Sequence, residues 1–242
     1  MNRTAFLAAA LLLAPFASSA AGGLYTADEL RKTYIPELLT AQSGIKGAEA
    51  PADGVLKVAV GQAEFDRSLS RDDTALFLAS ALCRAYEGAG DLRKFREITY
   101  VYEGKKESLP VTIKPETCEG TVKKASAASV GKDGVFTDPY LKGFYIPGIK
   151  KSLLASVSGK GSISLKDVTF GGHGKVVLLH EASEDGDLGA MKKNSKKAAG
   201  MLCRFSSMKG ELAAGHLTGI VYRYGNGSGT SFDIVLDRGN CR

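Results

Sequence analysis

The residues best suited to acid–base chemistry follow one another closely after position 180. His180 and Glu181 are followed by Glu184 and Asp185, and a histidine among carboxylates is a combination that hydrolases use to move protons. A solvated turn that leads into a helix has the same composition. We keep a hydrolase acting on a cell-envelope polymer as one alternative function for the chain.

Nothing else in the sequence completes a catalytic constellation. The three histidines lack the spacing of a zinc-binding His-Glu-x-x-His motif. Two Ser-x-x-Lys patterns, Ser129–Lys132 and Ser206–Lys209, do not fall at the start of a predicted buried helix, where a lysine could activate the serine. We therefore expect a protein that is not an enzyme and that holds no metal ion or other cofactor.

A run of lysines offers a different chemistry, the electrostatic capture of an acidic partner. The spacing i, i+1, i+4, i+5 places four lysines along the flank and outer face of one predicted helix. This lysine ridge consists of Lys192, Lys193, Lys196 and Lys197. Lys150 and Lys151 are expected on another helix of the same region. The pattern fits a protein with an acidic surface, an anionic glycan or lipid headgroups, and a merely solubilising face is the simpler alternative.

The charge of the chain is distributed unevenly between its halves. Residues 22–120 hold 13 Lys/Arg and 16 Asp/Glu, whereas residues 121–242 hold 18 and 10, so the net charges are −3 and +8. A protein that coats nucleic acid would be basic throughout its binding region. We therefore expect no nucleic-acid partner, and we expect the basic half to carry any polyanion site.

An internal repeat determines how these residues are positioned. The sequence Ala-Leu-Cys-Arg at 81–84 returns as Met-Leu-Cys-Arg at 201–204, and Tyr-Ile-Pro occurs at 34–36 and again at 145–147. Each copy ends in a cysteine. These matches predict a tandem duplication of one unit of roughly 100 residues, a length at which a small core is marginal without a covalent crosslink.

The repeat predicts the division of the chain into segments. We expect a first repeat over 21–118, a linker rich in Lys, Ala, Ser and Gly over 119–132, and a second repeat over 133–242. Residues 1–20 have the basic start, the apolar run and the small-residue end of a secretory signal peptide. The protein is therefore expected in the periplasm or outside the cell.

Four cysteines in an exported chain predict two disulfides, for which three pairings are possible. The repeat favours one disulfide in each copy. These would be Cys83–Cys118 and Cys203–Cys241.

Each repeat has the pattern of helix, strand, helix, strand and strand. The predicted fold class is α+β, with the cysteine-bearing helix packed on a small antiparallel sheet. In the first repeat, residues 40–54 are rich in Gly, Ala and Pro and are predicted to form a loop. The segment at about Ser162–Phe170 is predicted as an extra strand that only the second repeat has.

The two copies differ at the positions of the lysine ridge. Its counterparts in the first repeat are Asp72, Asp73, Leu76 and Phe77. Phe77 lies about 180° from the predicted core face of its helix, and an apolar side chain on an outer face is usually covered. We expect the other repeat or a partner to bury Leu76 and Phe77.

Together these features favour an exported, non-catalytic binding protein that acts through contact with another protein. An inhibitor, an immunity protein and an accessory to envelope assembly are the types that fit. The hydrolase, with His180 and its neighbouring carboxylates, and a polyanion-binding protein that uses the basic second repeat remain the alternatives.

Overall fold

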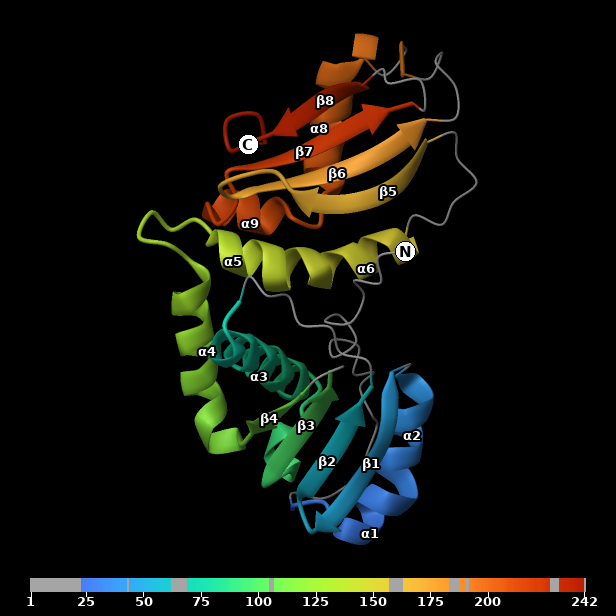
Figure 1. Cartoon of the computed structure of the whole chain (residues 1–242), viewed down its shortest axis with the longest axis vertical. Coiled ribbons are helices and arrows are strands. Elements are labelled where there is room, and N and C mark those ends of the chain that lie inside the picture. The colour runs from blue at the N-terminus through green and yellow to red at the C-terminus, as the bar shows by residue number, and fades with distance from the viewer. Residues whose placement is uncertain are drawn as a thin grey trace. The chain divides into compact units, whose positions relative to one another are not determined.

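The computed structural model describes residues 23–42, 44–61, 69–104, 107–156, 163–182, 188–189, 192–226 and 231–241. The chain divides into two compact units, Met1–Ala128 and Ser129–Arg242, and we describe each by itself. Each unit consists of a four-stranded sheet with helices packed against it (Figure 1). The segment predicted as a signal peptide lies outside the described residues.

The first unit has the order α, β, β, α, β, β, followed by one more helix. Its elements are α1 (Ala27–Glu29), η2 (Leu30–Tyr34), α2 (Ile35–Ala41), β1 (Ile45–Ala52), β2 (Val55–Val60), α3 (Arg71–Gly88), η3 (Leu92–Lys94), β3 (Glu97–Glu103), β4 (Ser108–Ile113) and α4 (Pro115–Ser129). The strands are arranged in the order β1-β2-β3-β4.

The second unit repeats the order α, β, β, α, β, β. Its elements are α5 (Asp138–Tyr140), η4 (Leu141–Tyr145), α6 (Ile146–Ser156), β5 (Ile163–Phe170), β6 (Lys175–Ala182), α8 (Ser195–Phe205), α9 (Lys209–Ala214), β7 (Gly219–Gly225) and β8 (Ser231–Leu236). Its strand order, β5-β6-β7-β8, matches that of the first unit.

The prediction of an antiparallel sheet is wrong for the central pair of each unit. β2 and β3 run parallel, as do β6 and β7, whereas both outer pairs are antiparallel. The chain leaves β2, passes through α3 and enters β3 beside it in the same direction. A helical crossover of this kind is what two neighbouring parallel strands require.

The predicted loop over residues 40–54 is also wrong, because it contains β1. Glycine, alanine and proline fill this strand, and such residues are tolerated at a sheet edge, where one row of backbone groups needs no partner. Ala48 pairs with Val58 of β2. β5 is therefore the counterpart of β1, and it is not an addition peculiar to the second repeat.

Each unit has a proline-containing helix that directly follows a π-type turn. Pro36 has no backbone N–H, and the wide turn η2 lies directly before the helix that contains it. The N–H of Ile35 bonds to the carbonyl of Leu30, five residues earlier. Such π-type turns re-route helical hydrogen bonds where a regular ladder is interrupted. The second unit has the same turn, η4, before its own proline.

A pair of matched glycines confirms that the two units share one backbone design. Gly54 and Gly174 each precede the second strand of their unit and have φ of +68° and +64°. Their carbonyls accept hydrogen bonds from the backbone N–H groups of Arg96 at 2.7 Å and Thr218 at 2.8 Å. A side chain here would strain the backbone and crowd the same neighbours, so glycine is required in both copies.

Alternating burial along β3 and β4 places one face of the first sheet in the core, whereas β7 of the second sheet is buried over most of its length. Tyr100 and Tyr102 are buried on β3, and Tyr222 and Tyr224 are buried on β7. The Tyr100 hydroxyl is 3.0 Å from that of Tyr86 on α3. These tyrosines are thus part of the core of their units.

The predicted disulfide pairing is confirmed. Cys83 bonds to Cys118 and Cys203 bonds to Cys241, with Cα–Cα distances of 5.5 and 5.4 Å. Cys118 lies in α4, so most of the segment predicted as a linker is helical, and the boundary between the units falls within it at residues 128 and 129. Lysine and alanine also favour helix formation, so the composition of residues 119–132 did not distinguish a linker from a helix.

We expect each disulfide to contribute a large share of its unit's stability. The crosslinks join cysteines 35 and 38 residues apart, and closing such loops in the unfolded chain stabilises by about 4 kcal/mol on the chain-entropy estimate. The double variant Cys83→Ala/Cys118→Ala should lower the free energy of unfolding by up to that amount in urea titrations. The double variant Cys203→Ala/Cys241→Ala tests the second unit in the same way. A loss of unfolding free energy below about 1 kcal/mol in both variants would contradict the estimate.

Candidate functional site

The lysine ridge is exposed, but it does not lie on one continuous helix. Asn194, with φ −101° and ψ 16°, interrupts the helical backbone, and α8 begins at the next residue. Lys192 and Lys193 therefore precede the break, whereas Lys196 and Lys197 lie in the first turn of α8. All four side chains are exposed, and none makes an ion pair with any residue that the structure describes.

The sequence of α8 explains why its lysines face outward. Ala198, Ala199 and Leu202 fall on one side of the helix and pack against the hydrophobic core of the second unit. Cys203, at the edge of that side, is 7% exposed and carries the disulfide. The rotation of the helix about its own axis is therefore fixed by packing and by a covalent bond.

The opposite side of α8 forms a continuous exposed surface, which we call the α8 outer face. It consists of Lys196, Lys197, Gly200, Met201 and Arg204. Met201 is 50% exposed, and Leu24, Leu39 and Val235 are exposed to a similar degree. The surface thus combines three positive charges with an apolar side chain and a bare stretch of backbone.

The equivalent side of α3 in the first unit is largely buried. Phe77 and Ser80 are 4% and 6% exposed, and Leu76 is half-buried. The low exposure of Phe77 means that this part of α3 is not an open surface. The prediction that the other repeat or a partner buries Leu76 and Phe77 stays a prediction.

Lys150 does not extend the lysine ridge. Its ammonium lies 2.5 Å from a carboxylate oxygen of Asp167, so it joins α6 to the edge strand β5. The side chain of Lys151 lies outside the part of the chain that the structure describes. The ion pair with Asp167 therefore separates Lys150 from the lysine ridge.

His180 and Glu181 do not form the acid–base pair that their adjacency allowed. Neighbouring side chains of a strand point to opposite faces, and Glu181 is exposed and paired with Lys166 at 2.7 Å. His180 stacks on Tyr224 instead, with the ring centroids 4.8 Å apart. Glu184 and Asp185, the other members of the predicted cluster, lie outside the described residues.

The environment of His180 favours a neutral imidazole. Burial lowers its pKa from the ordinary value of 6.5, against the opposing effect of a hydrogen bond to the backbone. The Nδ1 atom lies 3.3 Å from the carbonyl oxygen of Leu178, which can only accept a hydrogen bond. His180 thus behaves as part of the aromatic packing of the sheet.

Sequence reasoning missed two acid–base pairs that occupy related places in the two units. Asp91, which is 1% exposed, pairs with Lys94 at 2.9 Å and accepts a hydrogen bond from the hydroxyl of Tyr25. Glu211 pairs with His216 at 2.7 Å. Each pair precedes the third strand of its unit. The three-residue spacing between Asp91 and Lys94 could have indicated the first pair in the sequence. Both pairs hold the chain where it enters the third strand.

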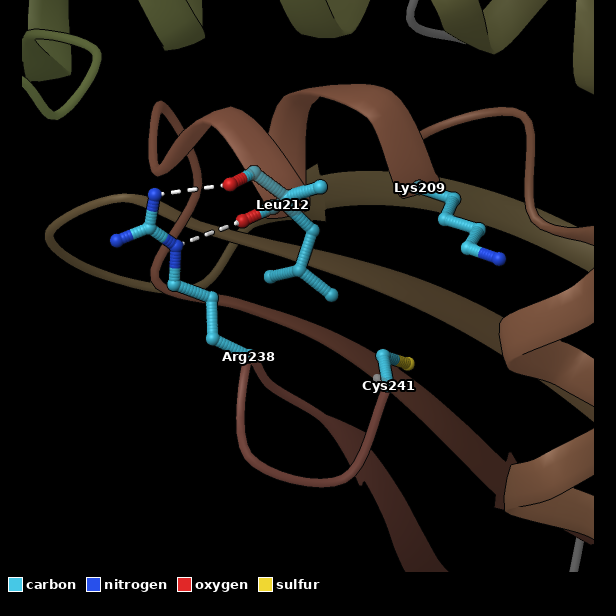
Figure 2. A pocket seen from close by; sticks show the side chains of 5 residues that line it. Lys209, Leu212, Arg238 and Cys241 are labelled. Atoms are coloured by element: carbon cyan, nitrogen blue, oxygen red, sulfur yellow. Dashed lines mark hydrogen bonds between the residues drawn. The ribbon is translucent and has the colours of Figure 1, made fainter.

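A small pocket lies beside the second disulfide. Its volume is about 340 Å³, and its lining consists of Lys209, Leu212, Ala213, Arg238 and Cys241. The guanidinium of Arg238 donates to the carbonyls of Leu212 and Ala213 at 3.2 and 2.8 Å, so it caps the end of α9. Figure 2 shows Lys209 and Arg238 on opposite sides of Leu212. The two cations therefore do not converge on one ligand.

Within the described ranges, no group of three or more His, Cys, Asp or Glu residues could hold a metal ion. No helix in the same ranges is long and apolar enough to cross a membrane. Comparison of the chain with protein-family models, with curated proteins and with solved structures gave no match. The α8 outer face is the strongest candidate for a functional surface among the described residues, because it combines three cations with exposed Met201.

The half-buried position of His180 predicts a specific pH dependence of stability. Because its folded-state pKa is lowered, the unfolded chain takes up a proton first as the pH falls below about 6.5, and the free energy of unfolding decreases. Above that pH the effect is absent. His180→Phe should therefore reduce the loss of stability between pH 7.5 and 5.5 in urea titrations.

His173 supplies the control for this experiment, because its side chain is exposed and lies near Asp133. His173→Gln leaves His180 in place and should keep the pH dependence that burial of His180 causes. An identical pH dependence in wild type and His180→Phe would show that His180 is not the group responsible.

Proposed function

We propose that this chain is an exported protein that acts by binding another protein and does not catalyse a reaction. The observation that carries the proposal is the α8 outer face, where positive charges surround an exposed methionine on a helix of fixed orientation. Such a surface is available to a partner without rearrangement. Inhibitors, immunity proteins and envelope accessory proteins all work through surfaces of this kind.

The fixed orientation of α8 supports binding over a merely solubilising role. A surface that is rigid before binding loses less conformational entropy when a partner arrives. α8 is held by the packing of Ala199 and Leu202 and by the Cys203–Cys241 disulfide.

The partner that fits this surface is a protein with an acidic patch. Unpaired cations on a helix attract carboxylates, accelerate association and disfavour basic competitors. A polyanion such as an anionic glycan would satisfy the charges, but it would gain little from the apolar Met201. The placement of His180 and Glu181 on opposite faces of β6 gives no support to the hydrolase alternative.

The proposal is tested by affinity capture from an envelope extract with the mature, oxidised protein. The test variant changes Lys192, Lys193, Lys196 and Lys197 to Glu. The control variant makes the same charge change at four other exposed lysines, Lys124, Lys132, Lys175 and Lys209. We expect one dominant protein to be retained by wild type and control and lost by the test variant, because charge reversal turns attraction into repulsion.

Three other results would count against the proposal. Equal retention of that protein by the test variant would remove the lysine ridge from the interface. Retention of anionic glycan or lipid alone, with elution by moderate salt, would favour the polyanion alternative. Retention of nothing by any of the three proteins would remove the support for a binding function.

A further inference from the structure

α3 and α8 are the equivalent helices of the two units. Cys83 and Cys203 occupy equivalent positions, because each joins its helix to the segment that follows the last strand of its unit. An offset of 120 residues then aligns the two helices. The α8 outer face corresponds to Leu76, Phe77, Ser80, Ala81 and Arg84.

In the first unit, α4 is joined to the C-terminal part of α3 at Cys83 and Arg84. Cys118 in its first turn bonds to Cys83, and Ser126 near its end accepts a hydrogen bond of 3.2 Å from Arg84. Along one side of α4, about one residue per turn is buried or half-buried. These residues are Cys118, Val122, Ala125 and Ser129.

In the second unit, no described residue covers the corresponding surface. The segment after β8 forms a turn, in which Asp237 accepts hydrogen bonds from the backbone of Gly239 and Asn240, and it brings Cys241 to the helix. All five members of the α8 outer face remain exposed. The same fold thus presents an uncovered helix surface where its first copy has a helix beside it.

The residues that differ between the copies specify the chemistry of the missing cover. Buried Phe77 and half-buried Leu76 are replaced by Lys197 and Lys196, so a partner that covers this surface in the second unit must bring carboxylates. A Cβ atom added at Gly200 would meet no atom within 4 Å, so a helix backbone can approach closely there. Methionine, being flexible and polarisable, adapts to different apolar surfaces.

From this comparison we propose that the α8 outer face docks an acidic amphipathic helix of a partner protein, in the way that α4 meets α3 at Cys83 and Arg84. The inference rests on the proposed binding function and names the element that the partner contributes. The apolar stripe of that helix lies over Gly200 and Met201, and its flanking carboxylates meet Lys196, Lys197 and Arg204. Helices that place an apolar face in a groove or on a helix surface are a common mode of recognition.

A second copy of this chain is a poor source of the docked helix. α4 presents exposed Lys123 and Lys124, and its two glutamates leave residues 115–129 with no net negative charge. Two copies would place lysines of α4 beside lysines of α8. The partner is therefore expected to be a different protein.

The test uses the full mature protein and a synthetic peptide as the probe. The peptide has about 18 residues, with leucine and alanine on one helical face and glutamate on both flanks, a length at which helix formation on binding is feasible. A second peptide has the same composition with the order permuted so that no apolar face exists. Fluorescence anisotropy measures both affinities, and backbone NMR shifts locate the contact.

Gly200→Leu separates helix docking from simple charge attraction. The substitution leaves every charge in place and suits a helix better than glycine does, so the fold should persist. A leucine side chain would nevertheless hold a docked helix away. We expect Gly200→Leu to weaken binding of the amphipathic peptide at least tenfold and to leave retention on a heparin-like resin unchanged.

The matched control is Gly120→Leu, at a glycine of α4 that is also exposed and has open space around it. It should bind the peptide as wild type does. Equal affinity for the permuted peptide, unchanged affinity in Gly200→Leu, or NMR shifts that exclude α8 would each overturn helix docking. If the peptide fails while an envelope protein is still captured through the lysine ridge, the docking mode is wrong and the proposed function stands.

Discussion

In each repeat, the helix that crosses between the parallel strands is fixed to the sheet from two sides. Apolar residues pack on the sheet, and a disulfide ties the helix to the segment after the last strand. The two constraints together determine the rotation of the helix, and so they decide which side chains face outward. In α8 the packed side consists mainly of alanines, so the disulfide is the more important of the two constraints there.

The duplication makes the difference between the repeats informative. Both copies keep the strand order, the parallel centre, the π-type turn before a proline and the glycine with positive φ. One helix surface is treated differently, because α3 is buried there and α8 is exposed and basic. Leu76 and Phe77 of α3 correspond to Lys196 and Lys197 of α8. The side chains at these positions are therefore packed in the first unit, whereas in the second unit they face solvent or a partner.

Much of the fold could be predicted because its signals are local. Thr26 and Glu29 form a capping box, whose three-residue spacing is visible in the sequence, and the repeat itself selected the correct disulfide pairing from three. The strand β1 could not be predicted, since alanine, glycine and proline read as a loop and the strand depends on pairing with β2. The strand–helix–strand order of each repeat indicates a parallel central pair, whereas the predicted sheet is antiparallel throughout.

The candidate site was predicted in part. The lysine ridge was visible as a charge pattern, yet the break at Asn194 and the ion pair of Lys150 depend on contacts that no short pattern encodes. For His180 and Glu181, the sequence suggested a shared site that the structure does not contain. Their adjacency suggested a shared site, and strand geometry places them on opposite faces.

The most direct test of the account is oxidative footprinting of the two methionines near the end of α8, in the free protein and with the captured partner bound. Met201 is 50% exposed and Met208 is 2% exposed, so Met208 serves as the internal buried control. The account predicts rapid peroxide oxidation of Met201 in the free protein and protection close to that of Met208 in the complex. A Met201 that stays fully reactive with the partner bound would contradict the claim that the α8 outer face is the docking surface.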